Sequence, residues 1–189
     1  IFEINEAERA YDIVLGKVKE KYIGILLKYP DNNNKEKTLI SVNNNKIDNI
    51  NIGFIGAGSF AQSYLLPTAK NIGSLDTVVT RTGINSKGVA EKFGFNFSST
   101  DSNDVMNNTS INTVFIATQH NTHKKYVVEA MRSNKNIFVE KPLAMNAEEL
   151  QEIVSEYENY KGLLMVGFNR RFSPISVKIK KELGNTGEP

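Results

Sequence analysis

The segment Asn51-Ile-Gly-Phe-Ile-Gly-Ala-Gly-Ser-Phe-Ala61 constrains the fold more than any other part of this 189-residue chain. An apolar run of the kind found in buried strands passes directly into a Gly-x-Gly-x-x-Ala turn and then into an amphipathic stretch. In such a turn Gly56 permits the tight bend, Gly58 lets the backbone approach a pyrophosphate, and Ala61 lets the helix and the strand pack closely. Amides at the start of the following helix would face the phosphate charge. The alternative is a glycine-rich strand-to-helix turn that binds no ligand.

The amino-acid composition fits a globular chain of one ordinary domain with an appendage, because 40% of the residues are hydrophobic. The formal net charge is only +2 and the lysines are scattered, so nucleic acid is not expected as a partner. The absence of cysteine excludes disulfides and thiolate zinc sites and favours a cytoplasmic location. No apolar run has membrane-spanning length, so no membrane partner is expected.

The order of sequence patterns predicts an appendage, a linker and one main domain. In residues 1–30, Asn5 with Glu8 has the form of a helix cap, an apolar stripe follows, and residues 22–27 have the pattern of a strand. Residues 31–48 are rich in Asn, Lys and Asp, as linkers are. The chain begins without an initiator methionine, and we expect it to be a fragment of a longer protein.

Residues 49–189 alternate short apolar runs with helical patterns, which predicts an α/β fold with a Rossmann-like, doubly wound parallel sheet. Helices are expected from about residues 59, 85, 102, 122 and 147, with Pro67 shortening or kinking the first. Gly94 suits a helix end, and Asn146 with Glu149 resembles a capping box. The six predicted strands are 50–55, 77–80, 96–98, 113–117, 136–140 and 163–168.

The second strand of the main domain ends in Thr80-Arg81, where dinucleotide folds usually carry an acidic residue that binds the adenosine ribose. Without that carboxylate, nothing repels a 2′-phosphate, and Arg81 can pair with the phosphate and stack on adenine. We therefore favour NADP(H) over NAD(H) as the cofactor. The alternative is an ordinary solvated arginine.

A polar cluster, Thr118-Gln-His-Asn-Thr-His123, follows the fourth strand of the main domain at the carboxyl edge of the sheet. Open α/β folds place their ligands at this edge, and these residues could line the nicotinamide side of the cofactor. Either histidine could instead be structural. Two histidines spaced in this way are a poor zinc signature without further ligands, so no metal site is predicted.

The fifth and sixth strands bring further polar residues to the same edge. Lys141 follows the fifth strand, where a partly buried ammonium can hydrogen-bond a substrate oxygen and take part in proton transfer, and Pro142 can fix its geometry. Asn169, Arg170 and Arg171 follow the sixth strand and can meet the substrate or the nicotinamide carboxamide. The alternatives are a simple Lys-Pro turn and a surface arginine pair.

Taken together, the glycine turn, residues 117–123, Val139-Glu-Lys-Pro142 and Asn169-Arg-Arg-Phe172 resemble the glucose–fructose oxidoreductase / inositol dehydrogenase / rhizopine catabolism (Gfo/Idh/MocA) family. The resemblance covers residues 50–189 and implies hydride transfer between a nicotinamide cofactor and a sugar, cyclitol or related polyol. It also implies that Lys141 contacts the reacting hydroxyl, that Glu140 and Pro142 complete its motif, and that His123 is the family histidine after the fourth strand.

The same resemblance implies a second α/β domain, with most of the substrate pocket and a surface for a homo-oligomer, beyond the residues present here. We therefore expect this chain alone to bind cofactor but to catalyse poorly or not at all. Residues 1–30 resemble the carboxyl end of a zinc-type medium-chain alcohol dehydrogenase. The residues predicted to contact the dinucleotide are Gly56, Gly58, Ser59, Phe60, Ala61, Thr80, Arg81, Thr118, Gln119, Asn121, His123, Glu140, Lys141, Pro142 and Arg170.

Two other functions fit parts of the pattern. A nucleotide-sensing or scaffold module would bind dinucleotide to control a partner without transferring hydride, and the glycine turn fits this function equally well. A degenerate domain would bind neither cofactor. Lys141 and the polar edge favour the enzyme. The substrate, the reaction direction and the oligomeric state are not determined by these residues.

Overall fold

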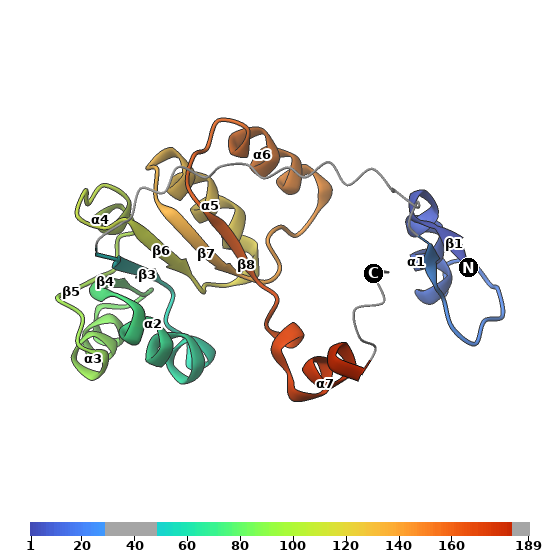
Figure 1. Ribbon diagram of the computed structural model, residues 1–189. Helices are drawn as coiled ribbons and strands as arrows, with labels where there is room; N and C mark the ends of the chain where they lie inside the picture. Colours follow the sequence, from blue (N-terminus) through green and yellow to red (C-terminus); the bar gives the residue numbers. More distant parts are fainter. Residues whose placement is uncertain (29–48, 183–189) are drawn as a thin grey trace. The chain divides into compact units, whose positions relative to one another are not determined.

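The computed structural model describes residues 1–28 and 49–182 (Figure 1). The chain divides into two compact units, residues 1–45 and residues 46–189. The predicted linker, residues 31–48, lies outside the described residues. Each unit is considered by itself below.

The first unit is a small β-α-β arrangement. Strand β1 (Phe2–Glu3) pairs in parallel with β2 (Leu27–Lys28), and η1 (Ile4–Glu6) and α1 (Ala7–Val14) lie between them in the chain. The predicted strand over 22–27 is wrong, because only its last residue enters a strand. The predicted cap is also wrong: Glu3 and Glu6 form the capping box, two residues before the expected position.

The predicted apolar stripe of α1 is only partly confirmed. The stripe was predicted from Ala7, Ala10, Tyr11 and Val14. Of these, Ala10 is buried, whereas Tyr11 and Val14 are exposed, and the other buried residue of the helix, Ile13, was not predicted. Two strands of two residues provide too small a sheet to cover more than one line of helix side chains. The stripe that the helix buries is therefore narrower than the sequence pattern.

The second unit contains a six-stranded sheet in which every pair of neighbouring strands is parallel. The strand order is β5-β4-β3-β6-β7-β8, so the chain first builds outward in one direction from β3 and then in the other direction from β6. This is the order of a doubly wound nucleotide-binding sheet, and it confirms the predicted fold class. The strands are β3 (Asn51–Ile55), β4 (Ser74–Val79), β5 (Phe97–Ser99), β6 (Thr113–Ile116), β7 (Asn136–Glu140) and β8 (Leu164–Gly167).

Helices cover both faces of this sheet (Figure 1). On one face, α2 (Leu66–Ile72) and α3 (Gly83–Phe93) pack on a core that includes Ile52, Phe54 and Val78. On the other face, a core around Val114 and Ile116 is covered by α4 (Asn103–Met106), α5 (His123–Arg132) and α6 (Ala147–Tyr157). Burial on both faces explains why the strands are almost continuously apolar instead of alternating.

Stacked phenylalanines join the central strands on the first face. The ring of Phe115 lies 5.1 Å from Phe54 and 5.0 Å from Phe138, both in stacked orientations. Because these residues occupy β3, β6 and β7, the stack crosses the position where the strand order reverses. It therefore holds together the strands whose carboxyl ends carry the candidate site.

Local signals in the sequence set several helix ends. Gly94 ends α3 in the left-handed conformation, with φ of 84°, as predicted. The Asn146 side chain accepts a hydrogen bond from the Glu149 amide at 2.8 Å. The Glu149 carboxylate accepts from the Met145 amide instead of the Asn146 amide, so only half of the predicted capping box is present. Near Pro67, a π-helical turn η2 (Ala61–Leu65) precedes α2, as expected where proline removes a helix hydrogen bond.

Two further elements follow β8 and were not predicted. They are the 3₁₀ turn η4 (Asn169–Phe172) and helix α7 (Pro174–Glu182). Another 3₁₀ turn, η3 (His120–Thr122), lies between β6 and α5. Within residues 1–28 and 49–182, no helix is both long enough and apolar enough to cross a membrane.

Candidate functional site

The glycine turn after β3 lies against the end of β6, at the point where the strand order reverses. Gly56 has a φ of +84°, which favours glycine. A Cβ added to it would lie 2.6 Å from the Ala117 carbonyl oxygen and 2.8 Å from Thr118 Cγ2. Glycine is therefore required here both by the backbone conformation and by the neighbouring loop.

Gly58 is exposed, and a Cβ added to it would meet no protein atom within 4 Å. Packing within the protein therefore gives no reason for glycine at this position. The space beside it belongs to a cavity, so a side chain at Gly58 would project into volume that a ligand could use. This arrangement fits the close approach of backbone and pyrophosphate that the Gly-x-Gly-x-x-Ala pattern predicts.

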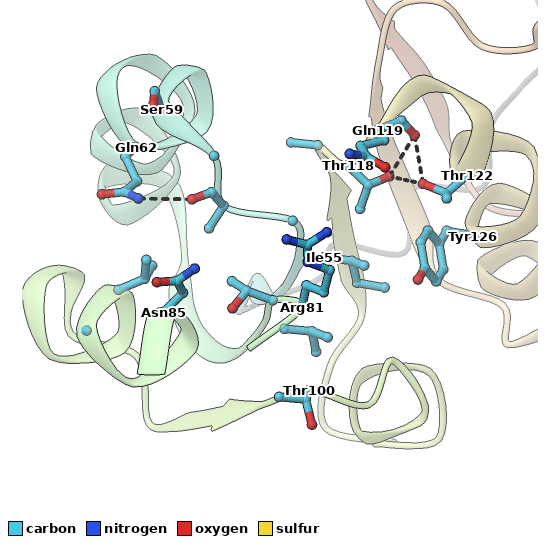
Figure 2. Close-up of a pocket in the computed structure, with 18 of the residues that line it drawn as sticks. Ile55, Ser59, Gln62, Arg81, Asn85, Thr100, Thr118, Gln119, Thr122 and Tyr126 are labelled. Atoms are coloured by element: carbon cyan, nitrogen blue, oxygen red, sulfur yellow. Dashed lines mark hydrogen bonds between the residues drawn. The ribbon is translucent and has the colours of Figure 1, made fainter. Parts of the chain in front are cut away.

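The first cavity, of about 940 Å³, runs along the carboxyl edge of the sheet between the glycine turn, the start of α3 and the end of β6 (Figure 2). Among the described residues that line it, Arg81 is the one charged side chain. The lining residues are Ile55, Gly56, Ala57, Gly58, Ser59, Gln62, Val79, Thr80, Arg81, Ile84, Asn85, Gly88, Val89, Thr100, Ala117, Thr118, Gln119, Thr122 and Tyr126.

The turn after β4 presents Arg81 to this cavity (Figure 2). Thr80 Oγ1 donates a hydrogen bond to the backbone carbonyl of Thr82 at 2.9 Å, which closes the turn around Arg81. Asn85, in the first turn of α3, lines the same cavity. This end therefore offers a cation and an amide, and none of the described residues lining the cavity is acidic.

The opposite wall is held by hydroxyl groups in the loop after β6. Thr122 Oγ1 lies 2.7 Å from Thr118 Oγ1 and 2.7 Å from the Gln119 carbonyl oxygen (Figure 2). These contacts join the two ends of the short η3 turn. The predicted residues Thr118 and Gln119 therefore line the cavity from a fixed loop, with Tyr126 beside them.

A second cavity, of about 420 Å³, shares Gly58, Ala117 and Thr118 with the first. It brings together residues from four separate parts of the sequence and contains four ionisable side chains. The expected partial burial of Lys141 is not observed, because its side chain is exposed. The remaining lining residues are Phe60, Ala61, His120, Glu140, Lys141, Asn169 and Arg170.

Glu140, the last residue of β7, is only 9% exposed. Burial raises the pKa of its carboxyl group above the ordinary value, while the amide and charge of Lys141 and the nearby His123 act in the opposite direction. A Cβ on Gly167 of β8 would lie 2.8 Å from Glu140 Oε1. The absence of a side chain at Gly167 therefore leaves room for this carboxylate.

His123 lies at the start of α5 and is 0% exposed. Its Nδ1 lies 2.7 Å from the Pro142 carbonyl oxygen and its Nε2 lies 3.2 Å from the Thr118 carbonyl oxygen. The ring thus joins the loop after β6 to the loop that carries Lys141. It lines neither of the two cavities and connects the two loops, and the cofactor contact predicted for His123 stays a prediction.

Two other predicted contacts, Asn121 and Pro142, also lie outside the two cavities. His120 and Asn169 line the second cavity. Both belong to the polar edges that the sequence indicated, and Asn169 was expected to meet the substrate or the nicotinamide, but neither was among the residues predicted to contact the dinucleotide. No group of three His, Asp or Glu side chains that could hold a metal ion occurs in the described part of the chain.

Gln62, Asn85 and Tyr126, which line the first cavity, were also absent from the prediction. They come from helical segments, whose inward-facing polar residues have no distinct signal in one sequence. Gln62 donates from Nε2 to the Ala57 carbonyl at 2.9 Å, so it also supports the glycine turn.

Comparison with known proteins agrees with this geometry. Residues 50–168 match the model of the Gfo/Idh/MocA family, described as an oxidoreductase family with an NAD-binding Rossmann fold. The chain is 32% identical over 145 residues to an inositol 2-dehydrogenase of Acidothermus cellulolyticus, which covers 74% of this chain and 42% of that protein. It is 27% identical over 143 residues to an inositol 2-dehydrogenase of Salmonella typhimurium, which covers 72% of this chain and 43% of that protein.

Solved structures show the same likeness. A levoglucosan dehydrogenase in complex with NADH and levoglucosan has a TM-score of 0.65 and 26% identity, and the match covers 71% of this chain and 39% of that one. A 3-ketoreductase from Actinomadura kijaniata in complex with NADP has the same TM-score at 20% identity, over 71% of this chain and 42% of that one, which supports the fold alone. The chain spans less than half the length of these relatives. By the family match over residues 50–168, the chain belongs to the Gfo/Idh/MocA oxidoreductases and carries their NAD-binding Rossmann fold.

Proposed function

We propose that this chain is the nucleotide-binding part of an oxidoreductase that transfers hydride between NADP(H) and a sugar, cyclitol or related polyol. The main support is that a glycine-lined cavity suited to a dinucleotide shares three lining residues with a second cavity that contains Lys141. The inositol dehydrogenases among its relatives support the substrate class. A bound nicotinamide would supply the hydride chemistry, and the chain would supply binding, orientation and proton exchange.

The two turn glycines allow cofactor binding to be tested separately from folding. Gly58→Ala adds a methyl group to open space, so the melting temperature should not change, while affinity for a dinucleotide should fall. If the methyl group costs about 1–3 kcal/mol against the phosphate, affinity falls about fivefold to about 150-fold. Calorimetric titration with NADPH and NADH measures this change.

Gly56→Ala is the matched comparison, because its Cβ meets the Ala117 carbonyl and its φ is +84°. This variant should lose both stability and affinity. If Gly58→Ala binds dinucleotide as tightly as the unmodified chain, the pyrophosphate does not lie against this turn.

We favour NADP(H) over NAD(H) because Arg81 is the one charged side chain among the described residues of the first cavity. Arg81→Asp should weaken NADPH binding by about tenfold or more, since a charge-assisted hydrogen bond contributes about 1.5–3 kcal/mol. Binding should shift toward NADH, whose ribose 2′-hydroxyl can donate to the new carboxylate. Titration of both cofactors against both proteins measures the change in preference.

Lys87→Asp is the charge-matched control, because Lys87 is also exposed, lies on α3 and does not line the cavity. It should leave the ratio of the two affinities unchanged. An equal loss of NADPH affinity in Lys87→Asp and Arg81→Asp would mean that Arg81 acts only through the net charge of the chain.

Lys141 is proposed to hydrogen-bond the reacting oxygen of the substrate and to orient it. It is exposed, it lines the second cavity, and its backbone follows β7 directly. In a chain extended to the length of the relatives, Lys141→Ala should lower polyol turnover by about 10²–10⁴-fold, the usual contribution of a positioned proton-transfer group. Initial rates with myo-inositol, followed by reduced-nicotinamide absorbance, measure this effect.

Lys161→Ala is the control, because Lys161 is exposed and lines neither cavity. The alternative function, a nucleotide sensor or scaffold without hydride transfer, is favoured if Lys141→Ala retains normal turnover or if no turnover occurs with any polyol while dinucleotide binds. The first cavity fits both functions, whereas the ionisable groups of the second favour the enzyme.

We also propose that residues 1–30 are the end of a separate domain of the medium-chain dehydrogenase type. The parallel pairing of β1 with β2 around α1 supports a unit built from strands and a crossover helix. All lining residues of both cavities lie between residues 55 and 170. Removing residues 1–45 should therefore change the NADPH dissociation constant, measured by calorimetry, by less than about twofold. For comparison, a tenfold change corresponds to about 1.4 kcal/mol of binding free energy. A larger loss would mean that this unit belongs to the nucleotide-binding domain.

A further inference from the structure

Tyr126 is the one aromatic side chain among the described residues that line the first cavity. It lies in the first turn of α5 and is half-buried, because part of its ring packs on the core of the second face of the sheet. The Lys125 ammonium lies over the ring, 5.3 Å from its centroid. A ring has two faces, so one face remains for a ligand in the cavity.

The strand order places Tyr126 and Arg81 on two sides of the end of β3. Ile55, the last residue of β3, pairs with Val79 of β4 on one side and with Ile116 of β6 on the other. The turn with Arg81 follows β4, and α5 with Tyr126 follows β6. Neighbouring strands lie about 4.8 Å apart, so the two flanking strands are separated by about 10 Å.

Both side chains also lie toward the same face of the sheet. Ile55 and Val79 belong to the core that α5 covers, and both line the cavity. Arg81 stands two residues after Val79, and in an extended chain such residues point to the same face. In Figure 2, Ile55 lies between Arg81 and Tyr126. The result is a slot with a guanidinium group on one side, an aromatic ring on the other, and an apolar floor.

A slot of this width suits one flat ring system. A planar group in contact with a planar group on each side needs them about 7–8 Å apart, because non-bonded atoms in contact are about 3.5–4.0 Å apart. This is close to the spacing of the two strands that flank β3. The 2′-phosphate proposed to pair with Arg81 is carried by the same ribose as the adenine. The base must therefore lie within one sugar of Arg81, and guanidinium groups stack on aromatic faces.

We infer that Tyr126 is an adenine-binding residue that stacks on the base opposite Arg81, an inference that rests on the proposed function. The base lies over Ile55 and Val79, with the Tyr126 ring against one of its faces. Stacking requires no donor or acceptor on the base, so Tyr126 recognises the face of the adenine and not its hydrogen-bonding edge. The residue holds the adenosine half of the cofactor and takes no part in the reaction.

Ile84 offers the base a different position. It lies in α3, is 87% exposed, and lines the same cavity, so a base could pack on it instead of on Tyr126. The two positions differ in an observable quantity, because an aromatic ring shifts the magnetic resonance of protons over its face upfield and an isoleucine does not. The chain contains no tryptophan, and Tyr126 is the one aromatic among the described lining residues, so such a shift identifies it.

The probes are adenosine 2′,5′-bisphosphate and adenosine 5′-monophosphate, which lack the nicotinamide half. The adenine H2 and H8 resonances should move upfield when the probe binds the unmodified chain. In Tyr126→Leu this movement should disappear, and the dissociation constant from calorimetry should rise about fivefold to about 150-fold, the range for loss of one base–aromatic stack.

Tyr126→Phe keeps the ring, so its dissociation constant should stay within about twofold of that of the unmodified chain, with the same upfield shift. Tyr157→Leu is the matched control, because Tyr157 is exposed on α6 and lines neither cavity. Circular dichroism checks that each variant folds. If Tyr126→Leu does not fold, the shift in the unmodified chain together with Tyr126→Phe decides the assignment.

Binding of a probe to the unmodified chain without the upfield shift would overturn the inference, as would a folded Tyr126→Leu that retains both the shift and the affinity. A loss in Tyr126→Phe equal to that in Tyr126→Leu would also overturn it, because the hydroxyl group and not the ring would then hold the base. A loss confined to Ile84→Ala would place the base on that side chain.

The proposed function and the inference fail in different ways. If NADPH or NADH binds and neither adenosine probe does, the dinucleotide site stands and the role of Tyr126 is overturned. If no dinucleotide and no probe binds, the proposed function fails and the inference fails with it.

Discussion

The close approach of the Gly56 turn to the Ala117 carbonyl and the Thr118 side chain is the contact on which the rest of the site depends. β3 and β6 are neighbours at the point where the strand order reverses, and their following loops diverge from there. Both cavities include Gly58, Ala117 and Thr118, so the distance between these loops sets the geometry of both cavities together. A side chain at Gly56 would separate the loops and alter both at once.

The fold was predictable because its signals are local and repeated. Apart from β5, with the sequence Phe-Ser-Ser, the strands of the sheet are mostly apolar runs, and all six predicted strands are present with shifts of a few residues. The small first unit was less predictable. Tyr22 and Ile23 have strand-forming side chains but are exposed, because a sheet of two short strands offers no further surface to pair with or to cover them.

The site was predictable by segment but not always by residue. Parallel strands bring their carboxyl ends to one edge, so Arg81, Thr118 and Lys141 could be placed there from the strand order alone. The choice between His120 and His123 could not be made in this way. In a 3₁₀ turn, residues three apart lie on the same side, so only the depth of each ring below the surface decides which one meets the cavity.

The two cavities differ sharply in the number of charged side chains that line them. The first has one cation among its described lining residues, whereas the second has four ionisable groups within less than half the volume. The three residues that line both cavities are small or carry a hydroxyl group: Gly58, Ala117 and Thr118. An extended ligand crossing that junction would place its phosphates beside backbone amides and its reacting end among titratable side chains. Under the proposed function, cofactor preference therefore depends on residues of the first cavity and proton exchange on residues of the second.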